Sequence, residues 1–188
     1  MDTSLVLMIV VVAAALMLLF AWRVYNRLVA MRNNVRNAWS DVGIQLRFRH
    51  DLVPNLVESV KGYMSHERET LESVARARSS AMTSNADIAT RAAAELALSS
   101  AVGKLFAVAE RYPDLKASPN FLLLQEQLTT TENRLAFARQ HYNETVRQFN
   151  TLIAEFPWNL VASVLRYSPE QMFVLESQDR AAAVQLAS

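Results

Sequence analysis

The 188-residue chain contains no cysteine and only three glycines. The lack of cysteine excludes disulfides, a thiol nucleophile and thiolate metal ligands. Scarce glycine combined with abundant alanine favours an all-helical fold. The formal net charge is +1, and no basic face with interleaved aromatic residues can be found, so the sequence gives no support for nucleic-acid binding.

A long uncharged run occupies the beginning of the chain. No charged side chain lies between Thr3 and Trp22, and roughly 20 apolar residues rising about 1.5 Å each span the ~30 Å hydrocarbon core of a bilayer. Only Asp2 precedes the run, where a cleavable signal usually carries a basic residue. We therefore predict a transmembrane anchor at 1–22, a helical bundle at 23–157, and an amphipathic segment with a polar tail at 158–188.

The residues that follow the anchor are strongly basic. From Arg23 to Arg49 there are six arginines and a single acidic residue, Asp41. The positive-inside rule therefore predicts a single-pass protein of the plasma (inner) membrane with its soluble domain in the cytoplasm. The arginines do not form one stripe, so we favour a role in orientation over binding to anionic headgroups. A soluble domain outside the cytoplasm is the alternative topology.

Apolar residues beyond the anchor recur at three- and four-residue steps, as in a helix packed on one side. Continuing this row would bury Arg49, and Pro54 removes the amide hydrogen that would bond to the carbonyl of His50. We therefore predict that the first helix ends near 47–50 and that Asp51 caps a second helix. A single kinked helix is the alternative.

The second predicted helix ends in the polar segment 79–85. Its apolar row consists of Val53, Leu56, Val60, Met64, Leu71 and Val74. Ser84 and Asp87, three residues apart, resemble a capping box for the third helix. Ser118 followed by Pro119 predicts the start of the fourth helix, with proline in its first position.

The fourth predicted helix has a sustained seven-residue repeat, which indicates a long seam against neighbouring helices. One row consists of Phe121, Leu128, Leu135, Tyr142, Phe149 and Phe156, and the other of Leu124, Thr131, Ala138, Thr145 and Leu152. Pro157 ends the pattern. Four helices with short links predict an all-α, antiparallel four-helix bundle.

Four segments of the chain are distinctive: RFRHDLVPNLVESVKGYMSHE (47–67), AVAERYPDLKASPNF (107–121), TENRLAFARQHYN (131–143) and FNTLIAEFP (149–157). Together they resemble the LemA family. The resemblance covers nearly the whole chain in order, and it implies a helical-bundle domain behind one transmembrane helix, without an established enzymatic activity. Phe48 stands where the family commonly has a basic residue, and the segment around Arg166 lacks the usual glycine.

The segment between the third and fourth predicted helices reads as a structural turn. Pro113 restricts the residue before it to extended conformations, and Asp114 favours a turn. We expect Leu115 and Phe121 to close the end of the bundle. A loop that binds a partner is the alternative, because loops on rigid scaffolds often carry function.

Candidate residues for chemistry are few. The histidines are His50, His66 and His141. None belongs to a Glu-x-x-His or His-Glu-x-x-His motif, and no glycine-rich phosphate loop is present. The neighbouring carboxylates of His66 are Glu67, Glu69 and Glu72; a weak metal site is conceivable there, but we favour a solvated face on which Arg68 pairs with Glu72.

Two other polar groups have structural explanations. His50 beside Asp51 could be a base with its orienting acid, but no Ser or Thr nucleophile stands nearby, so we favour helix capping. Glu132, Arg134 and Arg139 flank the seam of the fourth helix, where we expect ion pairs at the bundle edge rather than a specific docking surface. We assign no catalytic, cofactor-binding or metal-binding residue.

The antiparallel order returns the end of the fourth helix to the membrane. Trp158, Val161 and Leu165 share a face, so this piece either touches the headgroups or folds back onto the bundle.

The sequence as a whole predicts a non-catalytic membrane scaffold or adaptor of the cell envelope. Its partners would be the bilayer, unidentified membrane or cytoplasmic proteins and, conceivably, a second copy. The alternative is a metal-dependent or hydrolytic enzyme with a site inside the bundle.

Overall fold

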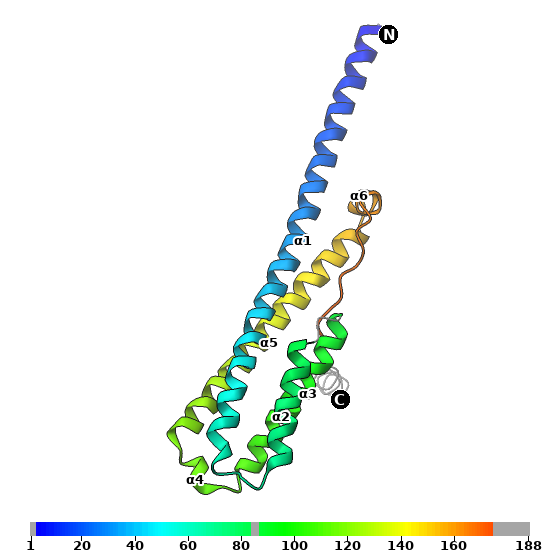
Figure 1. The fold of residues 1–188 in the computed structure, drawn as a ribbon. Coiled ribbons are helices and arrows are strands. Elements are labelled where there is room, and N and C mark those ends of the chain that lie inside the picture. Colours follow the sequence, from blue (N-terminus) through cyan, green and yellow to red (C-terminus); the bar gives the residue numbers. More distant parts are fainter. Residues whose placement is uncertain (1–2, 84–86, 175–188) are drawn as a thin grey trace, which may run out of the picture. The chain divides into compact units, whose positions relative to one another are not determined.

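The computed structural model describes residues 3–83 and 87–174 (Figure 1). These residues form helices and no strand, which confirms the predicted all-α class. The helices are α1 (Thr3–Lys61), α2 (Arg68–Thr83), α3 (Ile88–Ala109), α4 (Pro113–Lys116), α5 (Pro119–Ala154) and α6 (Trp158–Val164).

The chain divides into two compact units. Among the described residues, the first unit combines 3–39 with 142–171, and the second combines 40–141 with 172–174. The beginning of α1 and the end of α5 therefore belong to the first unit. The end of α1 and the beginning of α5 belong to the second, together with α2, α3 and α4.

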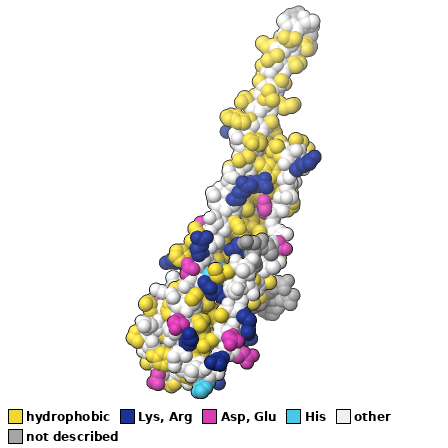
Figure 2. Space-filling model, viewed as in Figure 1, with side chains coloured by type: hydrophobic (Ala, Val, Ile, Leu, Met, Phe, Trp, Pro, Cys, Tyr) yellow, Lys and Arg dark blue, Asp and Glu magenta, His cyan; other side chains and the backbone are white. Residues whose placement is uncertain are grey.

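The N-terminal part of α1 is apolar and uncovered. Its most apolar stretch has a mean hydropathy of 3.0, and none of that stretch is buried. In the space-filling view its side chains are almost all hydrophobic (Figure 2). α3 also has the length and composition to cross a membrane, at a mean hydropathy of 1.4, but a third of that stretch (33%) is buried. By these criteria α1 is the stronger candidate for a membrane span.

The predicted break near 47–50 is wrong, because α1 continues to Lys61 with Pro54 inside it. Proline leaves the carbonyl four residues earlier without its usual helical hydrogen bond. In the structure this carbonyl, that of His50, accepts a hydrogen bond of 2.7 Å from Nε of Arg78 in α2. A side chain far along the sequence thus replaces the missing backbone donor, and the helix ends at Lys61 instead.

A continuous row of buried residues runs along α1 at three- and four-residue steps. It consists of Val24, Leu28, Met31, Val35, Ala38, Val42, Leu46, Arg49, Val53, Leu56 and Val60. Of the row expected from the sequence, Leu28, Val35, Val42 and Leu46 are buried, whereas Tyr25 is 46% exposed and Trp39 is only partly buried. The continuation of the row through Arg49 is also buried. What was wrong was the inference that a helix would end rather than bury an arginine.

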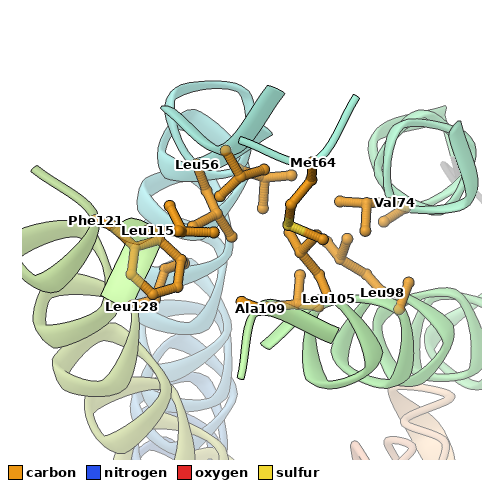
Figure 3. Packing of buried hydrophobic residues seen from close by; sticks show 14 residues of the cluster. Leu56, Met64, Val74, Leu98, Leu105, Ala109, Leu115, Phe121 and Leu128 are labelled. Atoms are coloured by element: carbon orange, nitrogen blue, oxygen red, sulfur yellow. The ribbon is translucent and has the colours of Figure 1, made fainter. Parts of the chain in front are cut away.

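The core of the second unit is built from α1, α2, α3, α4 and α5. In Figure 3 the labelled side chains of these helices point toward one another. Leu115 and Phe121 are buried in this cluster, as predicted for the segment that joins the third and fourth expected helices. The rings of Phe106 and Phe121 meet edge to face with centroids 6.0 Å apart. This geometry is favourable for aromatic pairs.

Other boundaries also differ from those predicted. The second helix was expected to begin near Asp51, but residues 51–61 belong to α1 and α2 begins at Arg68. α2 continues to Thr83, so residues 79–83 are helical. Asp87 is itself the N-cap of α3, and its carboxylate accepts a hydrogen bond of 2.7 Å from the backbone N–H of Thr90. Ser84, the other member of the expected capping box, lies outside the described residues. Pro119 begins α5 as predicted.

The two rows of the α5 repeat differ in burial: in the second row Thr131 and Thr145 are buried, and its other members are partly buried. Five members of the first row are buried: Phe121, Leu128, Leu135, Tyr142 and Phe149. The sixth, Phe156, lies beyond the end of α5 and is 77% exposed. The helix ends before this position, so the repeat cannot carry Phe156 into the seam.

Polar and aromatic contacts organise the first unit. The rings of Trp39 and Tyr142 lie 5.0 Å apart, and the Tyr142 hydroxyl donates a hydrogen bond of 2.7 Å to the carbonyl of Gln171. Asn150 both donates to the carbonyl of Glu170 and accepts from its N–H, at 2.9 and 2.8 Å. These bonds attach the extended segment after α6 to α5.

Candidate functional site

A buried arginine lies at the centre of the second unit. Arg49 occupies a core position of α1 and is 1% exposed. A buried guanidinium is tolerated only when it is paired and hydrogen-bonded, because the loss of hydration costs several kcal/mol, of the order of the attraction regained from a partner. The groups around Arg49 therefore decide whether this part of the chain folds.

Three side chains from two other helices surround the Arg49 guanidinium. Glu95 of α3 lies 3.5 Å away as an ion pair, Nη1 to Oε2. Glu132 of α5 lies 2.9 Å away, Nε to Oε1. Ser99 of α3 accepts a hydrogen bond of 2.7 Å from Nη2. Arg49 thus joins α1, α3 and α5, and its charge faces two carboxylates.

The partners of Arg49 differ greatly in exposure. The Glu95 side chain is 1% exposed and occupies a core position of α3, whereas the Glu132 side chain is 44% exposed. Oε1 of Glu95 also lies 2.9 Å from Nε2 of His50, itself 7% exposed. Glu95 is therefore a buried carboxylate between two basic side chains, and Glu132 closes the cluster on the solvent side. We call Arg49, His50, Glu95, Ser99 and Glu132 the ionic cluster.

The members of the ionic cluster contact one another through ion pairs and hydrogen bonds. His50 and Glu95 form an acid–imidazole pair, but Glu95 is also paired with Arg49, and both members are buried. Oε2 of Glu95 has the ion pair as its contact and makes no hydrogen bond. Within 3–83 and 87–174, no group of three or more histidine and acidic side chains has the arrangement of a metal site.

An open groove lies between α1 and α5 in the second unit. Several residues that line it are sequence neighbours of members of the ionic cluster. It encloses about 500 Å³. Its lining comprises Gln45, Phe48, Asp51, Leu52 and Asn55 from α1, and Leu123, Glu126, Gln127, Thr130, Thr131 and Arg134 from α5. Phe48 is 55% exposed and Leu123 52% exposed. The groove therefore combines accessible apolar side chains with a mixed polar rim.

The residues weighed for a weak metal site, for which we favoured a solvated face, can now be placed. His66 is exposed in the turn between α1 and α2. Glu67 accepts hydrogen bonds from Arg111, at 2.7 Å, and from the Tyr112 hydroxyl, at 3.2 Å. Partial burial and this bond raise the pKa of Tyr112. The predicted pair of Arg68 with Glu72 is wrong, because Glu72 contacts Arg76 instead, at 3.5 Å.

Two further expectations are resolved by the ionic cluster. Asp51 is exposed and lines the groove, so the acid beside His50 is Glu95 and not its sequence neighbour. Glu132 forms an ion pair as expected, but its partner is the buried Arg49 rather than an edge residue of its own helix. Arg134 lines the groove.

Glu95 was missed, although a signal for it exists in the sequence. In the sequence of the third helix, Leu98, Val102 and Leu105 recur at steps of three and four residues, and one step of three residues back from Leu98 is Glu95. A glutamate in one core row and an arginine in another are complementary charges. Reading the two rows together would have predicted the pair.

Comparison with known proteins identifies relatives of this chain. The model of the LemA family matches residues 38–186, most of the chain. The chain belongs to the LemA family. Protein LemA of Metamycoplasma hominis is 31% identical over 142 residues, which are 74% of this chain and 64% of that protein.

Shorter matches connect the chain to magnetosome proteins. Magnetosome protein MamQ 2 of Paramagnetospirillum magneticum and MamQ of Magnetospirillum gryphiswaldense are 30% and 26% identical over 73 residues. The match covers 39% of this chain and 27% of each relative. The chain therefore spans about two thirds of the LemA relative and about a quarter of each magnetosome relative.

Proposed function

We propose that this LemA-family protein is a membrane-anchored, non-catalytic scaffold or adaptor of the cell envelope, which acts through contacts between its helix faces and other proteins. The observation that carries the proposal is α1 itself. The N-terminal part of this uninterrupted helix is apolar and uncovered, whereas its C-terminal part packs in the core of the second unit. An apolar stretch of this length needs a bilayer or an equivalent apolar environment.

In this proposal residues 1–22 form the single membrane span, and the helices of the second unit form an antiparallel bundle held by the ionic cluster. The excess of arginine directly after the span favours a cytoplasmic location of the soluble part, at the plasma (inner) membrane. Extraction of full-length protein with alkaline carbonate tests the anchor. Retention in the membrane pellet supports the span, and release into the supernatant refutes it.

The groove between α1 and α5 is the surface that we assign to protein partners. Protein interfaces place aromatic and aliphatic anchors in a centre surrounded by polar groups, and Phe48 and Leu123 have this setting. A photo-crosslinking amino acid at either position in living cells should give discrete crosslinked proteins. The matched control is Phe137, which is 72% exposed and lies outside the groove. Equal crosslinking at all three positions would contradict the assignment.

A metal-dependent or hydrolytic enzyme is the second candidate, and the buried pair of His50 and Glu95 is the observation that favours it. Metal analysis of the purified full-length protein distinguishes the two functions. Stoichiometric metal that is lost in His50→Ala or His66→Ala would support the enzyme. A metal-free protein that retains its crosslinks at the groove would support the scaffold.

A further inference from the structure

The short helix α6 packs on α1 close to the point where the apolar run ends. Val24 and Leu28 lie one helical turn apart on α1 and are completely buried. Ala162 of α6 packs against them, with Trp158 and Val161 at its sides. Trp22, two residues before Val24, is 62% exposed. In Figure 1, α6 lies beside α1, which continues toward its N-terminus without a neighbour. The covering of α1 by protein therefore begins at α6.

The opposite side of α6 exposes an outer row of apolar side chains. Leu160 and Val164 are 59% and 81% exposed, and they share a face because they are four residues apart within the helix. Phe156, in the turn before α6, is 77% exposed and adds a third accessible apolar side chain beside this row. The inner face of α6 is already satisfied by α1, so the outer row is not needed for this packing.

Basic residues border the same place. Arg23 and Arg27 are exposed on α1, and Arg166 is exposed directly after α6, whereas Glu155 is the acidic residue beside the row. Apolar side chains bordered by basic residues are typical of helices that lie in the interface of a bilayer. Charge and continuity with the uncovered part of α1 therefore favour a lipid surface over a second protein.

We propose that α6 is an interfacial helix, which inserts Phe156, Leu160 and Val164 into the headgroup boundary of the bilayer that α1 crosses, while Arg23, Arg27 and Arg166 contact anionic headgroups. The proposal rests on the anchor assigned above. It gives α6 a role that its packing alone does not require: α6 contacts α1 and the membrane together and fixes the depth at which the first unit begins.

Spin labels on single cysteines test this proposal in the full-length protein. The chain has no cysteine, so each label reports one site. Labels replace Leu160 and Val164, with Leu16 as the reference inside the span and Phe137 as an exposed apolar reference in the second unit. In nanodiscs of phosphatidylcholine with phosphatidylglycerol, we expect high access to oxygen and low access to a polar nickel complex at Leu160 and Val164, as at Leu16, and the reverse at Phe137.

Each outcome is decisive. If labels at Leu160 and Val164 report water while Leu16 reports lipid, the interfacial role of α6 is refuted and the anchor stands. If both labels have low access to oxygen and to nickel, another protein surface such as a second copy covers the row, and the proposal is also wrong. If Leu16 reports water, the anchor and the proposed function fail together.

A second measurement does not depend on labels. In nanodiscs, Val164→Glu should accelerate amide hydrogen exchange in α6 relative to wild type, because a carboxylate at this position is repelled by anionic lipid. The conservative control Val164→Leu should leave exchange unchanged. Equal exchange in the two variants and in wild type would overturn the proposal.

Discussion

Replacing Arg49 by methionine should strongly destabilise the second unit. The variant keeps an unbranched apolar stem of similar length but leaves the Glu95 carboxylate, 1% exposed, with His50 as its partner. Removing one member of a buried ion pair typically costs about 3–5 kcal/mol, because the remaining charge has lost hydration without compensation. Glu132 adds little to this cost, since its exposed side chain regains water. We therefore expect a loss of about 3–5 kcal/mol for Arg49→Met.

The companion variants separate charge from packing. Glu95→Gln keeps an acceptor for His50 but removes the negative charge, and it should cost about 1.5–3 kcal/mol. The double variant contains neither buried charge of the pair. It should therefore be more stable than the sum of the single effects predicts, with a coupling of about 1–3 kcal/mol.

The assay is pulse proteolysis of full-length protein in nanodiscs across a urea series, which reports the midpoint of unfolding and, with the slope, the free energy. The matched control is the exposed pair of Glu72 and Arg76, 3.5 Å apart. Arg76→Met should change stability by less than about 0.5 kcal/mol. If Arg49→Met has the same midpoint as Arg76→Met, or if the double variant shows simple additivity, our interpretation of the ionic cluster is refuted.

Three further predictions use the same material. Arg78→Met should lower the free energy of unfolding by about 1–3 kcal/mol, because it leaves the His50 carbonyl without a donor. In a Pro54→Ala background the same substitution should cost less, because the backbone N–H at position 54 is restored. An equal cost in the presence and in the absence of Pro54 would contradict the replacement of the donor by Arg78. Burial and the nearby Glu170 charge raise the pKa of Tyr142 to about 12. The contribution of Tyr142 to the stability of the folded protein should therefore persist below pH 10 and decline as the pH rises toward 12. This decline, measured by urea midpoints and phenolate absorbance, should be absent in Tyr142→Phe. The hydrogen bond from the Thr90 N–H lowers the pKa of Asp87, so its capping is present above pH 3.8 and is lost on acidification; Asp87→Asn should remove this dependence, whereas an unchanged acid profile would exclude it.

Much of the fold could be predicted because it follows from local periodicity. Most of the expected row along α1, most core positions of the second predicted helix and five members of the α5 repeat are buried; the exceptions include Tyr25, Trp39 and Leu71. Burying one face of a helix fixes a spacing of three and four residues, and this spacing is visible without any knowledge of the neighbours. Leu115 and Phe121 were predicted on similar grounds, as apolar residues beside turn-forming ones.

The errors have a different origin, since each depends on a partner distant in sequence. Pro54 and Arg49 are both sound local reasons to end a helix. The helix nevertheless continues, because two distant side chains supply the missing partners. Arg78, 28 residues beyond His50, donates to the His50 carbonyl, and Glu95, 46 residues beyond Arg49, pairs with the arginine. No periodicity within α1 contains that information. The actual end of the helix, at Lys61, had a local signal in the glycine that follows it, but the stronger proline signal obscured this.

The position of the ionic cluster connects these errors to function. A buried ion pair gives little net stability compared with well-packed apolar residues, and its best-attested use is to specify one packing arrangement. Arg49 contacts Glu95 of α3 and Glu132 of α5, and Phe48 and Leu52, its neighbours on α1, line the groove. If the cluster specifies the register of these helices, the double variant of Arg49 and Glu95 should remain folded yet lose the discrete crosslinks at Phe48. If those crosslinks persist unchanged in the folded double variant, the cluster serves stability alone and the groove does not depend on it.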